Sequence, residues 1–170
     1  MKEFLRNIRK YFNFRMKEFL RKIHNYFDFL FEDGFEVAEY VGPEGFGNWI
    51  VYLQSNKLVI RIVQDRNEIS VCGAFPSKRV KDISNLYFIS LDAVIGYFSN
   101  DVAYDFFKRT PREIDVQFAK IARKLKSNYG RICLFFEKSN YARDKDDFEL
   151  FLERRSEHFL GPYGYKPRKK

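Results

Sequence analysis

The sequence has few of the residues that metal sites and covalent catalysis use. It contains two cysteines, Cys72 and Cys133, and two histidines, His24 and His158, all far apart along the chain. Zinc sites need clustered Cys and His ligands, and a catalytic triad needs a histidine with motif support. The glycine-rich stretch 42–47 lacks the Lys-Ser/Thr pair of a phosphate-binding loop and precedes a predicted strand. We therefore expect no metal, no cofactor and no catalytic residue.

Long apolar runs are also missing. No stretch approaches the roughly 18 residues that span a bilayer, and charged residues interrupt the N-terminus, so a secretory signal peptide is not predicted. Two isolated cysteines are typical of reduced thiols, which favours a cytoplasmic location. The chain has 170 residues, 45% hydrophobic and 32% charged, as expected of one globular domain with its own core.

Positive charge is abundant but unevenly placed. The net charge is +8; residues 1–27 carry eight Lys/Arg and two Glu, residues 161–170 carry four Lys/Arg, and residues 28–160 have a net charge of −2. Tails are weaker evidence for nucleic-acid binding than a basic stripe on a folded face. The residues that we expect to contact a polyanion, if one binds, are Lys10, Arg15, Lys166, Arg168, Lys169 and Lys170.

The opening of the chain occurs twice. Residues 1–14, MKEFLRNIRKYFNF, match residues 16–29 at ten of fourteen positions. Apolar residues recur at helical spacing over 16–31, and Gly34 is typical of the residue just past a helix end. We expect both copies to form one helix of about 30 residues, with the second copy packed and the first projecting or frayed. We interpret the repeat as a tandem duplication without new function; the alternative is an interfacial helix on an anionic membrane.

The remainder predicts a meander followed by helices. Strands with alternating apolar residues and short turns are predicted at 36–41, 48–54, 57–64 and 68–74. Helices are predicted to begin at Ser90, Thr110 and Ser139, the last two reaching about Glu137 and Leu160. The expected fold is α+β: an N-terminal helix, a four-stranded antiparallel meander, and three helices packed on one sheet face. We divide the chain into a duplicated helical extension, one α+β domain and a basic tail, over 1–15, 16–161 and 162–170.

The two faces of the predicted sheet are both apolar. The face expected to meet the helices consists of Trp49, Val51, Leu53, Leu58, Ile60, Ile62, Ile69 and Val71. We expect Trp49 and Ile60 to be buried, as well as Leu125 of the second predicted helix. The opposite face shows more apolar residues than an exposed face usually does. Either the segment 75–89 or a helix covers it, or it is a partner-binding face made of Ile50, Tyr52, Val59, Arg61 and Val63.

Four stretches give the chain a family likeness. They are YFDFLFEDGF, NWIVYLQSNKLVIRIVQDRNEISV, ISLDAVIGYF and LKSNYGRICLFF. From about Met16 to Gly161 the chain resembles small uncharacterised bacterial α+β proteins, some of which are immunity-type proteins that bind and block one toxin. This resemblance implies a protein partner and no catalytic residue.

Three functions follow from these observations, in order of preference. The first is a non-enzymatic protein-binding module, of immunity or regulatory type, that binds a protein partner or a second copy of itself. The second is association with nucleic acid or an anionic membrane surface through the basic N-terminal helix and C-terminal tail. The third is a small enzyme without a recognisable motif.

Overall fold

The computed structural model describes residues 2–44, 48–76, 80–106 and 113–163, with side chains from Phe14 onward except at 43–44 and 80–82. Its helices are α1 (Lys2–Tyr26), α2 (Asp28–Glu32), α3 (Leu91–Ser99), α4 (Ile114–Phe135) and α5 (Lys138–Leu160), with 3-10 turns η1 (Val80–Asn85) and η2 (Gly161–Tyr163). Its strands are β1 (Glu36–Glu44), β2 (Asn48–Gln54), β3 (Val59–Asp65), β4 (Glu68–Ala74) and β5 (Ile89–Ser90).

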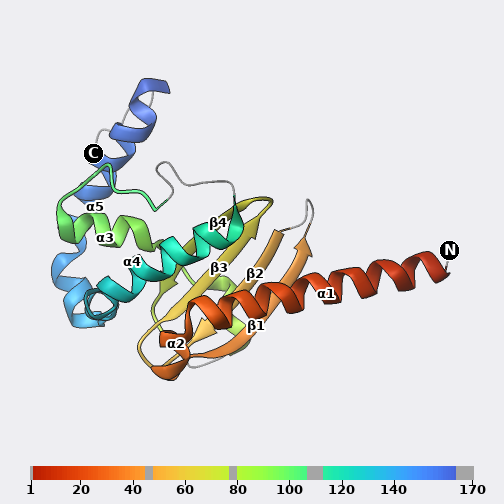
Figure 1. Cartoon of the computed structure of the whole chain (residues 1–170). Helices are drawn as coiled ribbons and strands as arrows, with labels where there is room; N and C mark the ends of the chain where they lie inside the picture. Colours follow the sequence, from red (N-terminus) through yellow and green to blue (C-terminus); the bar gives the residue numbers. More distant parts are fainter. Residues whose placement is uncertain (1, 45–47, 77–79, 107–112, 164–170) are drawn as a thin grey trace.

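The fold is α+β, with an N-terminal helix, an antiparallel sheet and several helices (Figure 1). The strands follow chain order, β1-β2-β3-β4-β5, each antiparallel to the next. The prediction of four strands misses β5. That strand has two residues and pairs Ser90 with Cys72 and Ile89 with Gly73, so it is too short for its alternation to be recognised in the sequence.

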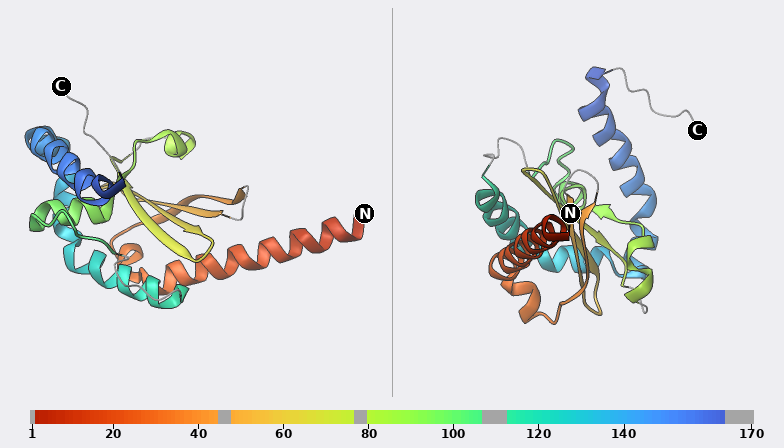
Figure 2. Two further views of the ribbon diagram at one scale, coloured as in Figure 1. Left: turned by 90° about the horizontal axis from the view of Figure 1, so that it is seen from above. Right: turned by 90° about the vertical axis from the view of Figure 1, so that its right-hand side faces the viewer.

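Helix α1 continues from the first copy of the repeat into the second without a break and ends at Tyr26, within the second copy. Met16, Phe19 and Ile23, at three- and four-residue spacing in the second copy, are buried against the core. The N-terminal part of α1 extends past the edge of the sheet, away from the rest of the protein (Figures 1 and 2). The helix ends earlier than predicted, because Phe27 has φ −110° and ψ 33° and separates α1 from the short α2.

The stop at Gly34 is as predicted. Gly34 has φ +85°, its N–H donates to the Phe31 carbonyl, and the Phe35 N–H donates to the Leu30 carbonyl. These two bonds form a Schellman motif, in which buried Leu30 and Phe35 supply the usual apolar contact across the helix end.

One face of the sheet is covered by helices, as predicted, although α5 packs on other helices. Helices α1 and α4 lie side by side across it, α3 packs on β4, and α5 packs on α3 and α4 (Figure 2). Seven of the eight residues predicted for this face are buried; Trp49 is half-buried, so the prediction for Trp49 was too strong. Gly73 permits close approach, since a Cβ there would lie 2.7 Å from the Phe136 ring and 2.8 Å from the Leu91 side chain.

The opposite face is covered from within the chain. Ile83 and the following segment pack on Tyr52 and Val59, which are 4% and 0% exposed. The Phe88 ring lies 5.8 Å from the Tyr52 ring and 4.4 Å from the Arg61 guanidinium carbon. The sequence left open whether the segment 75–89, a helix or a partner covers this face. The structure shows that residues 83–88 of that segment cover Tyr52 and Val59.

Candidate anion-binding groove between α1 and α4

Aromatic packing brings α1 and α4 together. The Tyr26 ring stacks on the Phe118 ring with centroids 5.5 Å apart and an interplanar angle of 8°. Phe19 and Phe27 each contact the same Phe118 ring at 6.0 Å. On the outer side, the Lys22 Nζ lies 2.8 Å from Asp115 Oδ1 and joins the two helices by an ion pair. These contacts fix the spacing of the helices and the position of Tyr26 between them.

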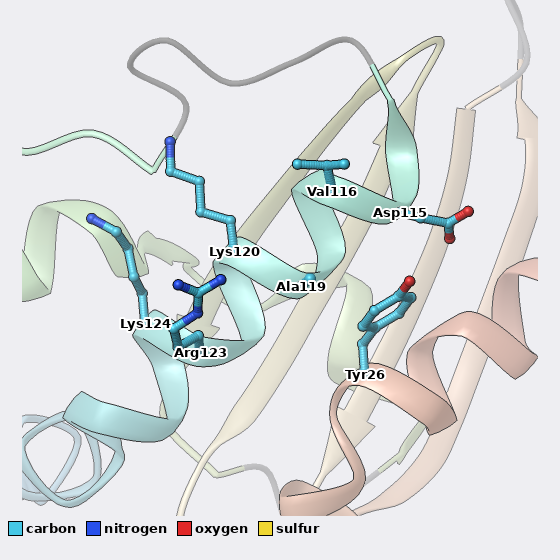
Figure 3. Close-up of a pocket in the computed structure, with 7 residues that line it drawn as sticks. All are labelled: Tyr26, Asp115, Val116, Ala119, Lys120, Arg123 and Lys124. Atoms are coloured by element: carbon cyan, nitrogen blue, oxygen red, sulfur yellow. The ribbon is translucent and has the colours of Figure 1, made fainter.

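A groove lies along the outer junction of the two helices. It consists of two adjacent hollows of about 560 and 420 Å³ that share Tyr26 and Asp115 as lining residues, and we call it the α1–α4 groove. The larger hollow is lined by Tyr26, Asp115, Val116, Ala119, Lys120, Arg123 and Lys124 (Figure 3). The smaller hollow is lined by Glu18, Arg21, Lys22, Asn25, Tyr26 and Asp115.

The groove is basic because of the local sequence of α4. Its apolar positions Phe118, Ile121 and Leu125 face the core, which places cations at the intervening positions on the outside. The Lys124 Nζ lies 4.5 Å from the centroid of the Tyr104 ring, at the distance of a cation–π contact. Figure 3 shows Tyr26 rising from α1 toward Asp115, with the cations on the α4 side.

The net charge of the two helices together is larger than the net charge of the whole chain. Helix α1 has eight Lys/Arg and two Glu, and α4 has five Lys/Arg and one Asp, against a chain total of +8. Residues 28–113 have nine Lys/Arg and 13 Asp/Glu, and residues 136–160 have five and seven. The expectation that all excess charge sits at the chain ends was therefore incomplete. The net charge of −2 for residues 28–160 did not reveal the cations of α4, because acidic residues elsewhere in that range offset them.

The predicted polyanion contacts fall mostly outside what the structure describes. The Lys10 side chain and the residues Lys166, Arg168, Lys169 and Lys170 lie outside the described part of the chain. Arg15 is exposed on α1 and lies 3.5 Å from Glu18 in an ion pair. The groove residues of α4 were not predicted. The available signal was the recurrence of cations at positions 120, 123, 124 and 126 of a predicted amphipathic helix, of which only the apolar side entered the prediction.

The predicted partner-binding face is only partly accessible. Tyr52 and Val59 are buried under the segment that contains Phe88, while Ile50, Arg61 and Val63 are half-buried. Cys72 pairs with Arg61 across β3 and β4 on the same face, and burial raises the pKa of its thiol.

A second polar cluster lies apart from the groove. Asp33 accepts hydrogen bonds from Lys57 and from the Tyr129 hydroxyl, and these bonds hold the pKa of Asp33 below its usual range. Burial, followed by the bond to Asp33, raises the pKa of Tyr129, and burial raises the pKa of Cys133. A raised thiol pKa disfavours the reactive thiolate, so the cluster has the properties of a structural clamp. Within the described residues no group of three His, Cys, Asp or Glu side chains is placed to hold a metal ion.

No described helix is both long enough and apolar enough to cross a membrane. No protein-family model, curated protein or solved structure matches the chain.

Proposed function

We propose that this protein is a non-enzymatic binding module whose α1–α4 face binds a polyanion. The observation that carries this proposal is the separation of charge. Residues 15–26 of α1 and the whole of α4, which lie side by side, have nine Lys/Arg and two Asp/Glu between them, whereas the segments 28–113 and 136–160 are both net acidic. A basic surface of this kind on a folded face attracts the phosphates of a nucleic acid and gives strong salt dependence.

The arrangement of the cations supports the same function. Arg21 on α1 and Arg123 on α4 are both exposed and line the two hollows of one groove. Lys22 and Lys124 are half-buried and are held by an ion pair and an aromatic ring. Cations fixed in this way lose less side-chain entropy on binding than freely moving lysines do.

A double charge reversal tests the proposal. Arg21→Glu with Arg123→Glu removes two cations from the groove and should weaken binding to heparin or to a nucleic acid at least tenfold at about 50 mM salt. The slope of log K against log salt should fall by about 2, since each lost phosphate contact accounts for a slope of about 0.7 to 0.9 and the added glutamates repel the ligand.

The matched control reverses the same amount of charge on another helix. Lys138→Glu with Arg154→Glu changes two exposed residues of α5 and should alter the affinity by less than about threefold, through net charge alone. Equal losses in both double variants would show that net charge, and not the groove, determines binding. A wild-type protein that binds no polyanion at low salt would contradict the proposal.

A protein partner is the second candidate function, and the exposed end of α5 favours it. The C-terminal part of α5 extends away from the sheet (Figure 2). Leu150, Phe159 and Leu160 of α5 are 54%, 38% and 47% exposed. An immunity-type inhibitor, as the family resemblance implies, would use a surface of this kind. A pull-down in which Leu150→Ser with Phe159→Ser loses a protein that the wild type retains would support this function, and identical capture by both would oppose it.

A further inference from the structure

The α1–α4 groove contains groups that a bare phosphate does not need. Tyr26 and Asp115 line both hollows, and Val116 is 38% exposed beside them. A carboxylate repels phosphate, and an exposed valine adds nothing to phosphate binding. Both groups do fit a nucleobase, which has apolar faces and, in cytosine, adenine and guanine, an amino group that donates to a carboxylate.

We infer that the α1–α4 groove binds an unpaired nucleobase of a single-stranded nucleic acid, with Tyr26 as its aromatic contact. This inference rests on the polyanion-binding function proposed above. In the bound state Asp115 accepts a hydrogen bond from the exocyclic amino group of the base. Lys120, Arg123 and Lys124 contact the phosphates on either side.

The position of Tyr26 supports this assignment. Its ring is oriented by stacking on Phe118 at 5.5 Å, and it lies where the two hollows join, so it is preorganised rather than free to rotate. Grooves that bind single strands combine a positively charged track with aromatic side chains on which the bases stack, at about 1–3 kcal/mol per base. Paired bases are stacked inside a duplex and do not present their faces to such a ring.

Asp115 predicts which base the α1–α4 groove prefers. It lies 2.8 Å from Lys22, but 59% of its side chain is exposed, which leaves room for a further donor. Cytosine presents an N4 amino donor to a carboxylate and thymine does not. Oligo-dC is therefore expected to bind more tightly than oligo-dT of the same length, although both carry the same charge and are pyrimidines.

The test compares four probes on the full chain by fluorescence anisotropy at one salt concentration: labelled oligo-dC and oligo-dT of about 12 nucleotides, a duplex of the same length, and labelled heparin. Tyr26→Leu should weaken binding to both single strands about 5- to 100-fold and leave heparin binding within about twofold. Tyr26→Phe keeps the ring and should bind as the wild type does. Asp115→Ala should abolish the preference for oligo-dC and strengthen heparin binding.

The outcomes separate the inference from the function on which it rests. A wild type that binds none of the probes would contradict both. Heparin binding with duplex affinity equal to or above single-strand affinity, or with no effect of Tyr26→Leu on the single strands, would overturn the inference alone. Displacement of oligo-dC by cytidine monophosphate at similar concentrations would assign the groove to a free nucleotide and would overturn the single-strand assignment.

A measurement on the wild type covers the case in which Tyr26→Leu fails to fold. Photo-crosslinking to an oligonucleotide that contains 4-thiouridine, followed by mass spectrometry, should place the crosslinks in peptides from residues 16–27 and 114–126. Crosslinks confined to other parts of the chain would overturn the inference.

Discussion

Lys57 and Asp33 form a two-pronged ion pair, in which the Lys57 Nζ lies 2.6 Å from Oδ1 and 2.7 Å from Oδ2 of Asp33. The pair ties the turn between β2 and β3 to the residue that follows α2. The Tyr129 hydroxyl of α4 donates to the same carboxylate, so three elements meet at Asp33. Lys57 is the first cause, and Tyr129 the second, of the lowered pKa of Asp33.

The lowered pKa predicts how stability depends on pH. A carboxyl whose pKa is lower in the folded state contributes its stabilisation above its unfolded pKa, near 4, and loses it as the pH falls through the folded value. Asp33→Asn should therefore be less stable than the wild type at pH 7, and the difference should shrink below about pH 4. Urea unfolding of both proteins between pH 3 and pH 7 measures this difference, and one that stays constant down to pH 3 would contradict the prediction.

The bond from Tyr129 to Asp33 should have its own measurable effect. Tyr129→Phe removes one hydroxyl that donates to a charged acceptor in a partly buried position, and should cost about 1 kcal/mol of unfolding free energy. In the Asp33→Asn background the same change should cost less, because the charged acceptor has gone. Equal costs in the two backgrounds would show that Tyr129 stabilises the fold through packing alone.

Alanine substitutions at two glycines should change the free energy of unfolding in opposite directions. Gly73→Ala places a Cβ 2.7 Å from the Phe136 ring and 2.8 Å from the Leu91 side chain, and should destabilise the protein by about 1–3 kcal/mol. Gly130 lies in the interior of α4, where a Cβ would have no neighbour within 4 Å outside the helix itself, and Gly130→Ala should stabilise by about 0.5–1 kcal/mol. Thermal unfolding of both variants checks the signs. Destabilisation by both would mean that the packing around α4 differs from the structure.

Period-two alternation was enough to assign the faces of the central strands. Ile60 and Ile62 belong to the core on the helix side as predicted, whereas Val59, which precedes them in β3, packs with Ile83 on the opposite face. Trp49 is less buried than predicted because it is the second residue of β2. Alternation predicts which sheet face a side chain lies on but not how deeply it is buried.

The groove could not be predicted, since it depends on how closely the Tyr26–Phe118 stack holds two helices separated by almost 90 residues in sequence. Helical periodicity places cations on one side of α4 but does not say what lies beside them.

The predicted core residues give a direct test of the sheet register and of the α4 face. Ile60 and Leu125 are both 2% exposed and belong to the same core cluster. Truncating either to Ala should cost about 2–5 kcal/mol, from lost burial and the cavity left behind. Denaturant melts of the two variants measure this cost, with Leu134→Ala, at an exposed position of α4, as a control that should stay within about 0.5 kcal/mol. Near-wild-type stability of both core variants would mean that the register or the helix face is wrong.

Deletion of residues 1–15 separates the two roles of α1. The second copy of the repeat supplies the buried residues Met16, Phe19 and Ile23, so the shortened protein should keep its fold. Its thermal midpoint should fall by less than about 5 °C, which corresponds to roughly 1.5 kcal/mol for a domain of this size. The deletion also removes five Lys/Arg and one Glu, so it should weaken polyanion binding and reduce its salt slope while leaving the groove intact. The preference for oligo-dC over oligo-dT should survive, because Tyr26 and Asp115 remain. A shortened protein that unfolds would show that the first copy is part of the domain, and one that loses the base preference would place the base contact on the projecting part of α1.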